Sequence, residues 1–335
     1  MKIWVIRVWW LWDSIIFSPF LRELRKLYPD DEISLFVQHN SSWEYFSRIK
    51  YVDKLEYIDK NSSLFTKIWY FFKYFKKYDL AIDTTGWSRL SSIIANLFWK
   101  KSIWFEKHGV YSVTIKENDY DINSFASLHN LTILNKLKNF SLDNFKLKLD
   151  FPLEQNDETK LKNLINNWKY CVFHTWWSSW KTWYYSKNLS TKQIQEIINI
   201  IISTWYTCII IWSKNDEEIK YIKDKPNLIK LTNLSIWELW YLIKWAELYI
   251  WWNSWPMRIS MALNKRSIVI SSATAECWQP QKKYFPNVNN IVSDYNGCSK
   301  CWLYTCKFNK DPKEQWLCIK NLDMNIIRDL ISNNN

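Results

Sequence analysis

The chain has 335 residues, 48% of them hydrophobic and 18% aromatic, which is enough for two domains with substantial cores. Its formal net charge of +12 favours anionic partners such as phosphorylated substrates, an anionic membrane face or nucleic acid. Because it contains no nucleic-acid-binding motif and no uninterrupted apolar stretch of about 18 residues, we expect neither nucleic-acid binding nor a membrane-spanning segment.

The first half of the sequence alternates short apolar runs, expected to be strands, with longer amphipathic runs, expected to be helices. Arg7 and Asp13 interrupt the apolar N-terminus, so we predict a strand, a turn and a helix there rather than a signal peptide. Alternation at this spacing indicates a parallel sheet with right-handed crossovers. The expected strands are 2–8, 32–38 and 79–85, and the expected helices are 13–29, 63–78 and 88–98.

A polar stretch, residues 140–169, separates this series from a second one and is the expected inter-domain region. We therefore predict an α/β protein made of two doubly wound, Rossmann-like domains with a cleft between them at the carboxyl ends of the sheets. The expected domains are 1–150 and 151–320, and 321–335 is a C-terminal helix and tail. The second series has expected strands 170–175, 207–212, 248–252 and 266–271 and expected helices 190–204, 235–246, 256–264 and 322–331.

The chain contains 25 Trp and only 3 Gly. Average glycine usage of roughly 7% would give about 23 glycines in a chain of this length. Trp–Trp pairs recur at 9–10, 176–177 and 251–252, where strands lead into loops and where folds need a positive φ or a close backbone approach. We interpret most of these tryptophans as glycines encoded by UGA, a codon that a few bacterial lineages read as glycine. The alternative is a protein that is rich in tryptophan.

With glycine restored, residues 8–14 become V-G-G-L-G-D-S, followed by L-R-E-L-R-K-L-Y-P. This resembles glycosyltransferase family 9, the lipopolysaccharide heptosyltransferase family, which begins with a strand, a G-G-L-G-D turn and L-R-x-L-R-x-x-Y-P. The resemblance covers nearly the whole chain except about residues 106–165, and it implies a GT-B architecture. Other similar segments are YDLAIDTTG (78–86), LFWKKSIWF (97–105), FHTWWSSWKTW (173–183) and LSIWELWYLIKWAELYIWWNSWPMRISMAL (234–263).

The resemblance implies a role for the turn after the first strand. By itself, Asp13 is more typical of a carboxylate that caps a helix than of a catalytic residue. In the family, the matching aspartate is the general base that removes a proton from the acceptor hydroxyl as its oxygen attacks the anomeric carbon of the donor. The implied reaction is inverting and independent of metal. The positions that correspond to glycines of the loops are Trp9, Trp10, Trp12, Trp176 and Trp177.

The resemblance places the nucleotide-diphosphate donor, an ADP-heptose-like molecule, at the segment N-S-W-P-M. This segment opens a short helix, whose N-terminal N–H groups favour an anion; a plain tight turn is the alternative. Asn253 stands where the family has Asp, and Arg258 stands where it has His. The resemblance assigns Lys181 to the donor phosphates; the alternative is an ordinary surface lysine. Glu217 is assigned to the ribose of the nucleotide; the alternative is an exposed acid at the end of a helix. The expected donor site comprises Lys181, Glu217, Asn253, Ser254, Trp255, Pro256, Met257 and Arg258.

Four cysteines have the spacing C-x2-C-x4-C-x11-C, which suits tetrahedral zinc. A structural zinc and four reduced thiols under a loop are equal alternatives, and no cofactor is expected for catalysis. Cys171 and Cys208 lie in expected strands, where we expect them to be buried and inert. The cluster is formed by Cys298, Cys301, Cys306 and Cys318.

The sequence thus favours a hexosyl- or heptosyltransferase of lipopolysaccharide or other cell-envelope biosynthesis. We expect it in the cytoplasm, in peripheral contact with the inner membrane face, where a lipid-linked or glycan acceptor is found. One alternative is a non-catalytic nucleotide- or sugar-binding protein with a degenerate donor site, suggested by Asn253 and Arg258. The other is a nucleotide-sugar epimerase of similar architecture.

Overall fold

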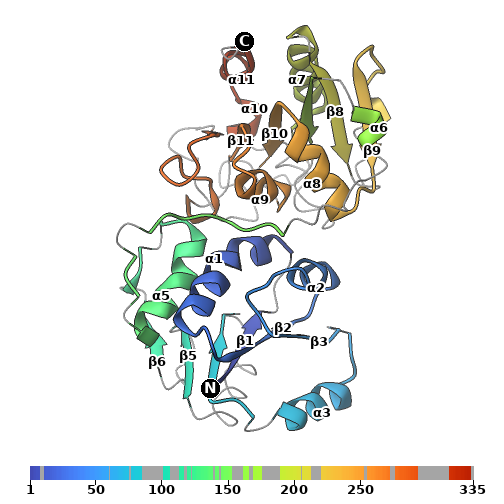
Figure 1. Cartoon of the computed structure of the whole chain (residues 1–335). Helices are drawn as coiled ribbons and strands as arrows, with labels where there is room; N and C mark the ends of the chain where they lie inside the picture. Colours follow the sequence, from blue (N-terminus) through green and yellow to red (C-terminus); the bar gives the residue numbers. More distant parts are fainter. Residues whose placement is uncertain are drawn as a thin grey trace. The chain divides into compact units, whose positions relative to one another are not determined.

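The computed structural model of the chain contains two compact units, Met1–Leu153 and Glu154–Asn335 (Figure 1). Each unit contains a six-stranded sheet in which every paired strand is parallel to its neighbour. The structure describes residues 1–7, 11–59, 61–74, 77–84, 101–105, 113–116, 119–121, 123–138, 140–142, 145–152, 161–165, 169–175, 189–204, 206–212, 220–252, 255–271, 276–292 and 317–332.

The first sheet has the strand order β3-β2-β1-β4-β5-β6, with β1 paired to both β2 and β4. β1 is buried from Ile3 to Arg7. Because side chains alternate along a strand, Trp4 and Ile6 face one side of the sheet, and Ile3, Val5 and Arg7 face the other. The elements of this unit are β1 (Lys2–Arg7), α1 (Leu11–Leu27), β2 (Glu32–Val37), α2 (Asn40–Phe46), β3 (Lys54–Tyr57), α3 (Leu64–Tyr74), β4 (Leu80–Asp83), β5 (Lys101–Phe105), β6 (Val113–Ile115) and α5 (Ala126–Lys138).

Helices cover both faces of this sheet. On the first face, Tyr70 of α3 packs against a buried cluster in which Trp4 stacks on Tyr78, with 5.8 Å between ring centroids. On the other face, the guanidinium of Arg7 lies 4.7 Å from the ring centroid of Phe17 of α1. α1 also packs against α5 (Figure 1). The cluster on the first face comprises Trp4, Ile6, Phe36, Ile58, Tyr78 and Ala81.

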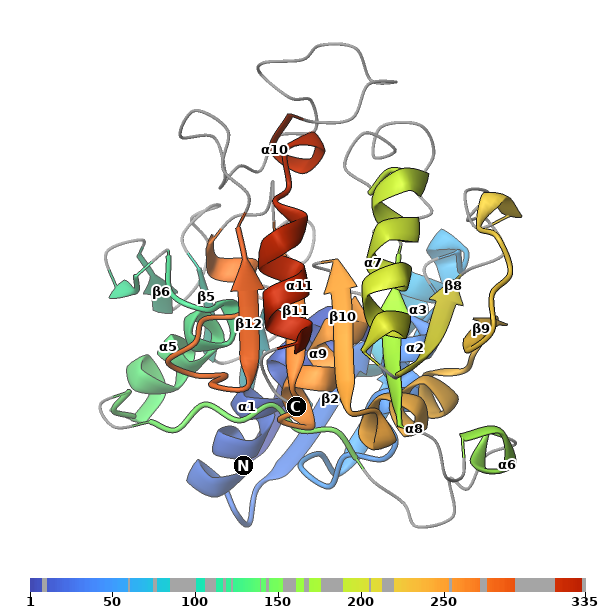
Figure 2. The same cartoon turned by 90° about the horizontal axis from the view of Figure 1, so that it is seen from above.

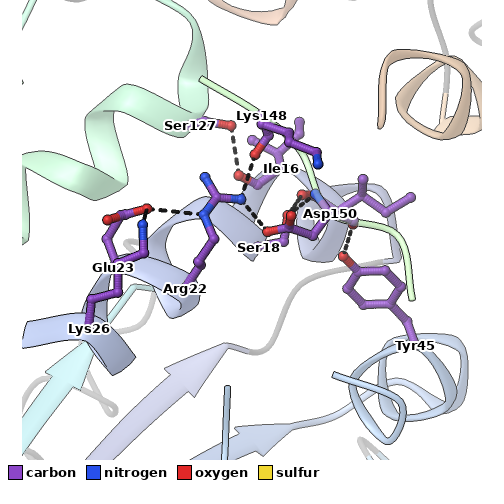
Figure 3. A network of polar contacts seen from close by, with 10 residues as sticks. Ile16, Ser18, Arg22, Glu23, Lys26, Tyr45, Ser127, Lys148 and Asp150 are labelled. Carbon is purple, nitrogen blue, oxygen red and sulfur yellow. Dashed lines mark hydrogen bonds and ion pairs between the residues drawn. The ribbon is translucent and has the colours of Figure 1, made fainter. Parts of the chain in front are cut away.

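Helix α1 continues through Pro19, which cannot donate a hydrogen bond to the carbonyl of Ile15. The hydroxyl of Ser18 donates to that carbonyl instead (2.8 Å) and accepts from the backbone N–H of Asp150 (2.8 Å). Arg22 pairs with the carboxylate of Asp150, and the hydroxyl of Tyr45 donates to the Asp150 carbonyl (Figure 3). The segment that leaves the first unit is therefore tied to the middle of α1.

The second sheet has the order β12-β11-β10-β7-β8-β9. α7 and α11 lie side by side on one of its faces (Figure 2), and α8 and α9 pack together on the other. Ser190 and Ser235 start α7 and α8 with capping boxes, completed by Gln193 and Glu238. The elements are α6 (Lys162–Ile165), β7 (Tyr170–His174), α7 (Thr191–Ser203), β8 (Thr207–Trp212), β9 (Leu228–Thr232), α8 (Ile236–Trp245), β10 (Leu248–Trp252), α9 (Trp255–Ala262), β11 (Ser267–Ile270), the 3₁₀ turn η4 (Glu276–Trp278), β12 (Val288–Ile291), α10 (Leu317–Lys320) and α11 (Met324–Ser332).

The α/β class with parallel sheets is confirmed, and the predicted elements are present with ends that differ by a few residues. The expected helix 88–98 lies outside the described residues. The sequence did not predict the edge strands β3, β6, β9 and β12, the neighbouring β5, or the helices α2 and α5. Among the described residues, no helix has both the length and the apolar character needed to cross a bilayer.

Candidate acceptor and donor sites

Each sheet contains a topological switch point, where successive connections turn to opposite sides. In the first unit it lies between β1 and β4, and in the second between β7 and β10. Ligands of open α/β sheets bind outside the carboxyl ends of the strands at such points. The two switch points therefore locate one candidate site in each unit.

In the first unit, the candidate base Asp13 lies at the β1–β4 switch point. Helix α1 begins at Leu11, so Asp13 is its third residue and belongs to its first turn, where the helix dipole favours a negative charge. The Asp13 residue is only 3% exposed. Asp13 is the one predicted catalytic residue, and the structure places it, buried, in the first turn of α1 at this edge of the sheet.

Arg7, the last residue of β1, is the residue that the sequence analysis did not assign to the site. It is 5% exposed, and its guanidinium donates to the backbone carbonyls of Asp13 (3.2 Å) and Thr84 (3.1 Å). The parallel register pairs Ile6 with Asp83, so the strands themselves bring Arg7 beside Thr84. The only sequence signal was a charged residue at the end of an otherwise apolar strand.

The electrostatics of this site combine one buried cation with two buried carboxylates. Burial lowers the pKa of Arg7 to about 10, against the opposing effect of Asp13 and Asp83, so Arg7 stays charged at neutral pH. Asp83, at the end of β4, is 1% exposed. The charge of the Arg7 guanidinium offsets part of the cost of burying these two acidic side chains.

In the second unit, the predicted donor segments leave neighbouring strand ends. Trp251 of β10 is in register with His174 of β7, and β8 lies on the other side of β7. The loops that carry Lys181, Glu217 and Asn253 therefore start at the same edge of one sheet. Several predicted residues themselves lie outside the described residues, namely Trp9, Trp10, Trp176, Trp177, Lys181, Glu217, Asn253, Ser254, Cys298, Cys301 and Cys306.

Helix α9 carries the described part of the predicted diphosphate segment. It begins at Trp255, with Pro256 in its first turn, a position that suits proline because an N–H there has no helical partner. Met257 is fully buried. The guanidinium of Arg258 is also buried and donates to the carbonyl of Trp278 in η4 (2.7 Å). Arg258 thus links α9 to η4 in this structure.

The ring of Trp251 stacks directly on that of His174. The centroids are 3.4 Å apart and the planes differ by 5°. Aromatic pairs prefer centroid distances of about 4.5–7 Å with an offset or tilt, so this contact is tight. Burial lowers the pKa of His174 well below its ordinary value, and its Nδ1 has no hydrogen-bond partner among the described residues. His174 is therefore neutral and packed against Trp251.

Three of the described cysteines are buried. Cys171 and Cys208 are fully buried on adjacent strands, and burial raises the pKa of both thiols, which makes them inert. Cys318 is buried in α10. Within the described ranges no group of three or more potential metal ligands is found.

The model of glycosyltransferase family 9 (heptosyltransferase) matches residues 74–311. Comparison with the sequences of curated proteins gives no significant match.

Solved structures with similar folds include two heptosyltransferases from E. coli. ADP-heptose lps heptosyltransferase II has 14% identity and a TM-score of 0.73, over 99% of this chain and 98% of the other. Heptosyltransferase WaaC with ADP has 14% identity and a TM-score of 0.69, over 100% of both chains. The iron-containing dodecameric glycosyltransferase TibC from enterotoxigenic E. coli has 11% identity and a TM-score of 0.56, over 99% of this chain and 77% of the other.

These similarities agree with the sequence-based prediction of fold and enzyme class. The fold is GT-B, as in the heptosyltransferases. Because the family model matches well over half of the chain, the protein belongs to glycosyltransferase family 9, the heptosyltransferase family, and is a glycosyltransferase.

Proposed function

We propose that the protein transfers a heptose, with inversion, from ADP-heptose to a lipopolysaccharide-like or other lipid-linked glycan acceptor. The names of the two E. coli structures support the sugar and the nucleotide, since one is an ADP-heptose heptosyltransferase and the other contains ADP. The first unit binds the acceptor and the second binds the donor. This assignment follows the resemblance and agrees with one switch point in each sheet.

The observation that carries the mechanism is the buried Asp13 at the β1–β4 switch point beside the Arg7 guanidinium. Asp13 takes the proton of the acceptor hydroxyl while that oxygen forms a bond to the anomeric carbon. The bond from that carbon to the diphosphate breaks at the same time, and ADP leaves. Lys181 and the segment 253–258 hold the diphosphate, and Glu217 contacts the ribose. None of these steps uses a metal.

Asp13→Ala tests the base directly. Transfer of heptose from ADP-heptose to a truncated lipopolysaccharide should fall by about 10²–10⁴-fold, the usual contribution of a general base. Binding of ADP, measured by calorimetry, should not change. The matched control is Asp30→Ala, which removes an exposed carboxylate beyond the end of α1. Transfer by Asp13→Ala at the wild-type rate would contradict the assignment of Asp13.

The excess of tryptophan is part of the same proposal. We propose that most tryptophans, including Trp251, are glycines in the native protein. The face-to-face stack of Trp251 on His174, and the unpartnered indole N–H of Trp251 among the described residues, support a smaller residue there. A positive φ does not contribute to this argument, because Trp251 lies in the extended β10 and the described non-glycine residues with positive φ are Asn227, Asn233 and Asn264.

Mass spectrometry of peptides from the native protein decides the identity of these residues. Glycine at positions 9, 10, 12 and 251 is expected. Tryptophan at all four positions would remove the explanation for the composition.

We also propose that Cys298, Cys301, Cys306 and Cys318 hold a structural metal. Their spacing supports it, and a structurally similar glycosyltransferase, TibC, is named as containing iron. Zinc or iron should copurify with the protein in a 1:1 ratio by elemental analysis, and Cys301→Ser should reduce the metal content. Purified active protein without either metal would contradict the proposal.

A further inference from the structure

Helix α3 of the first unit exposes an aromatic face. Phe65 is 85% exposed, Trp69 is 60% exposed and Phe72 is 68% exposed. The spacing i, i+4, i+7 places the three side chains along one side of the helix. No other element has more than one large exposed hydrophobic residue in the part of the chain that the structure describes.

The orientation of α3 is fixed by its opposite side. Tyr70 packs against the buried cluster on β1, β2 and β4, and its hydroxyl donates to the carboxylate of Glu56 on β3 (2.9 Å). The aromatic face is therefore held away from the core by contacts of the same helix. It cannot be buried by a rotation of α3 without losing the contact with the sheet.

Lys73 lies beside the aromatic face. The ammonium of Lys73 lies 5.5 Å from the ring centroid of Trp69 and 5.3 Å from that of Tyr70. Residues 60–78 contain five Lys and neither Asp nor Glu. The whole chain carries a net charge of +12. An exposed row of Phe and Trp beside Lys73, in a segment rich in lysine, matches the physical requirements for lying in the interface of an anionic bilayer.

We propose that α3 docks the protein on an anionic lipid membrane, with Phe65, Trp69 and Phe72 inserted between the headgroups and the lysines at the phosphates. The acceptor of the proposed reaction is lipid-linked, so docking through the proposed acceptor unit keeps the enzyme on the surface that contains this acceptor. Only the link to the acceptor rests on the proposed function; binding of α3 to a membrane does not. Vesicle binding can be measured without any sugar substrate.

Co-sedimentation of the full-length protein with vesicles tests the surface. The wild type should bind vesicles of phosphatidylglycerol and phosphatidylethanolamine and should not bind phosphatidylcholine alone. The double variant Phe65→Ser/Phe72→Ser should weaken binding by at least about tenfold, since both rings lose their apolar contact. Lys73→Glu should weaken it by about thirtyfold, because two units of charge change near the surface.

Matched controls separate the surface from general effects of charge and aromaticity. Tyr221→Ser removes a ring that is 75% exposed in the second unit, and Lys192→Glu makes the same charge change on α7. Both should bind vesicles like the wild type. Phe65 and Phe72 carry the test because their identity does not depend on how tryptophan codons are read. Unchanged circular dichroism will establish that each variant is folded.

Three outcomes would overturn the proposal. One is equal binding to neutral and anionic vesicles, and another is unchanged binding of the double variant. The third is a wild-type protein that does not bind vesicles but self-associates through Phe65 and Phe72, which would show that the aromatic face of α3 is a protein contact. Loss of transfer with vesicle binding intact would count against the proposed reaction alone. Transfer to a deacylated, soluble acceptor should be unaffected in the double variant, because this acceptor requires no membrane.

Discussion

Replacement of Arg7 offers the most informative test of how the fold supports the catalytic turn. We predict that Arg7→Gln shifts the acidic limb of the pH profile of kcat/KM to higher pH, whereas Arg7→Lys keeps it near the wild-type position. Arg7 is a buried cation beside the proposed base, and its guanidinium donates to the carbonyls of Asp13 and Thr84. Its loss therefore acts on both the charge and the position of Asp13.

The size of both effects follows from these contacts. A neighbouring cation commonly lowers a carboxyl pKa by about 1–3 units, so removing it should move the acidic limb upward by about that amount. The sign is fixed, since a base that loses a favourable cation protonates at a higher pH. Two hydrogen bonds from a charged donor are each worth about 1.5–3 kcal/mol, so the fold of the first unit should lose about 3–6 kcal/mol. Glutamine can replace only part of this.

The assay is transfer of heptose from ADP-heptose to a truncated lipopolysaccharide, followed from about pH 4 to about pH 9. Hydrogen exchange of peptides from β1 and β4 measures the stability of the first unit separately from the second. Arg328→Gln, a surface change on α11, is the control. A folded Arg7→Gln enzyme with an unmoved acidic limb would refute the electrostatic argument. If Arg7→Gln does not fold, an acidic limb of Arg7→Lys that moves to higher pH although the positive charge is kept would refute it as well.

Three further predictions concern stability. Trp251→Gly should leave stability unchanged or raise it, whereas removal of a native core tryptophan would cost about 3–5 kcal/mol in chemical unfolding. Tyr45→Phe should cost about 0.5–1.5 kcal/mol in thermal unfolding, because the Asp150 carbonyl loses its donor, and an unchanged midpoint would show that the hydroxyl is dispensable. The pKa of His174 is lowered in the folded state, so the unfolded chain binds the proton first as the pH falls. The free energy of unfolding should therefore be independent of His174 above about pH 6.5 and should decrease below that pH. His174→Gln should flatten this fall, and an equal slope in the variant would assign it to other groups.

Elements with a regular pattern could be predicted from the sequence. α7 and α8 begin at capping boxes, Ser190 with Gln193 and Ser235 with Glu238, and their apolar faces follow the helical period. β1 and β10 are central strands whose continuous apolar runs reflect burial on both faces. Such signals are local, so a single sequence contains them.

Helix α5 shows why other elements could not be predicted. It buries Ser127, Asn130 and Thr132, whose side chains bond to the carbonyls of Ile16, Ala126 and Leu128. Buried polar residues of this kind erase the hydrophobic period on which the prediction depends. The edge strands β3, β9 and β12 are partly exposed and carry charged or amide side chains. These polar residues interrupt the apolar run by which a buried strand is recognised in a sequence.

The sequence by itself determined the alternation of strands and helices, the family resemblance and the position of Asp13 near the start of the helix that follows the first strand. Only the tertiary structure decided that Arg7 also lies against Thr84, because that contact depends on the parallel register of β1 with β4, and the two residues are 77 positions apart in the chain. In the same way, the heptad-like spacing of Phe65, Trp69 and Phe72 was present in the sequence, but its exposure depends on Tyr70 and the sheet beneath it. Pattern is encoded locally, whereas burial and charge pairing arise only when distant segments meet.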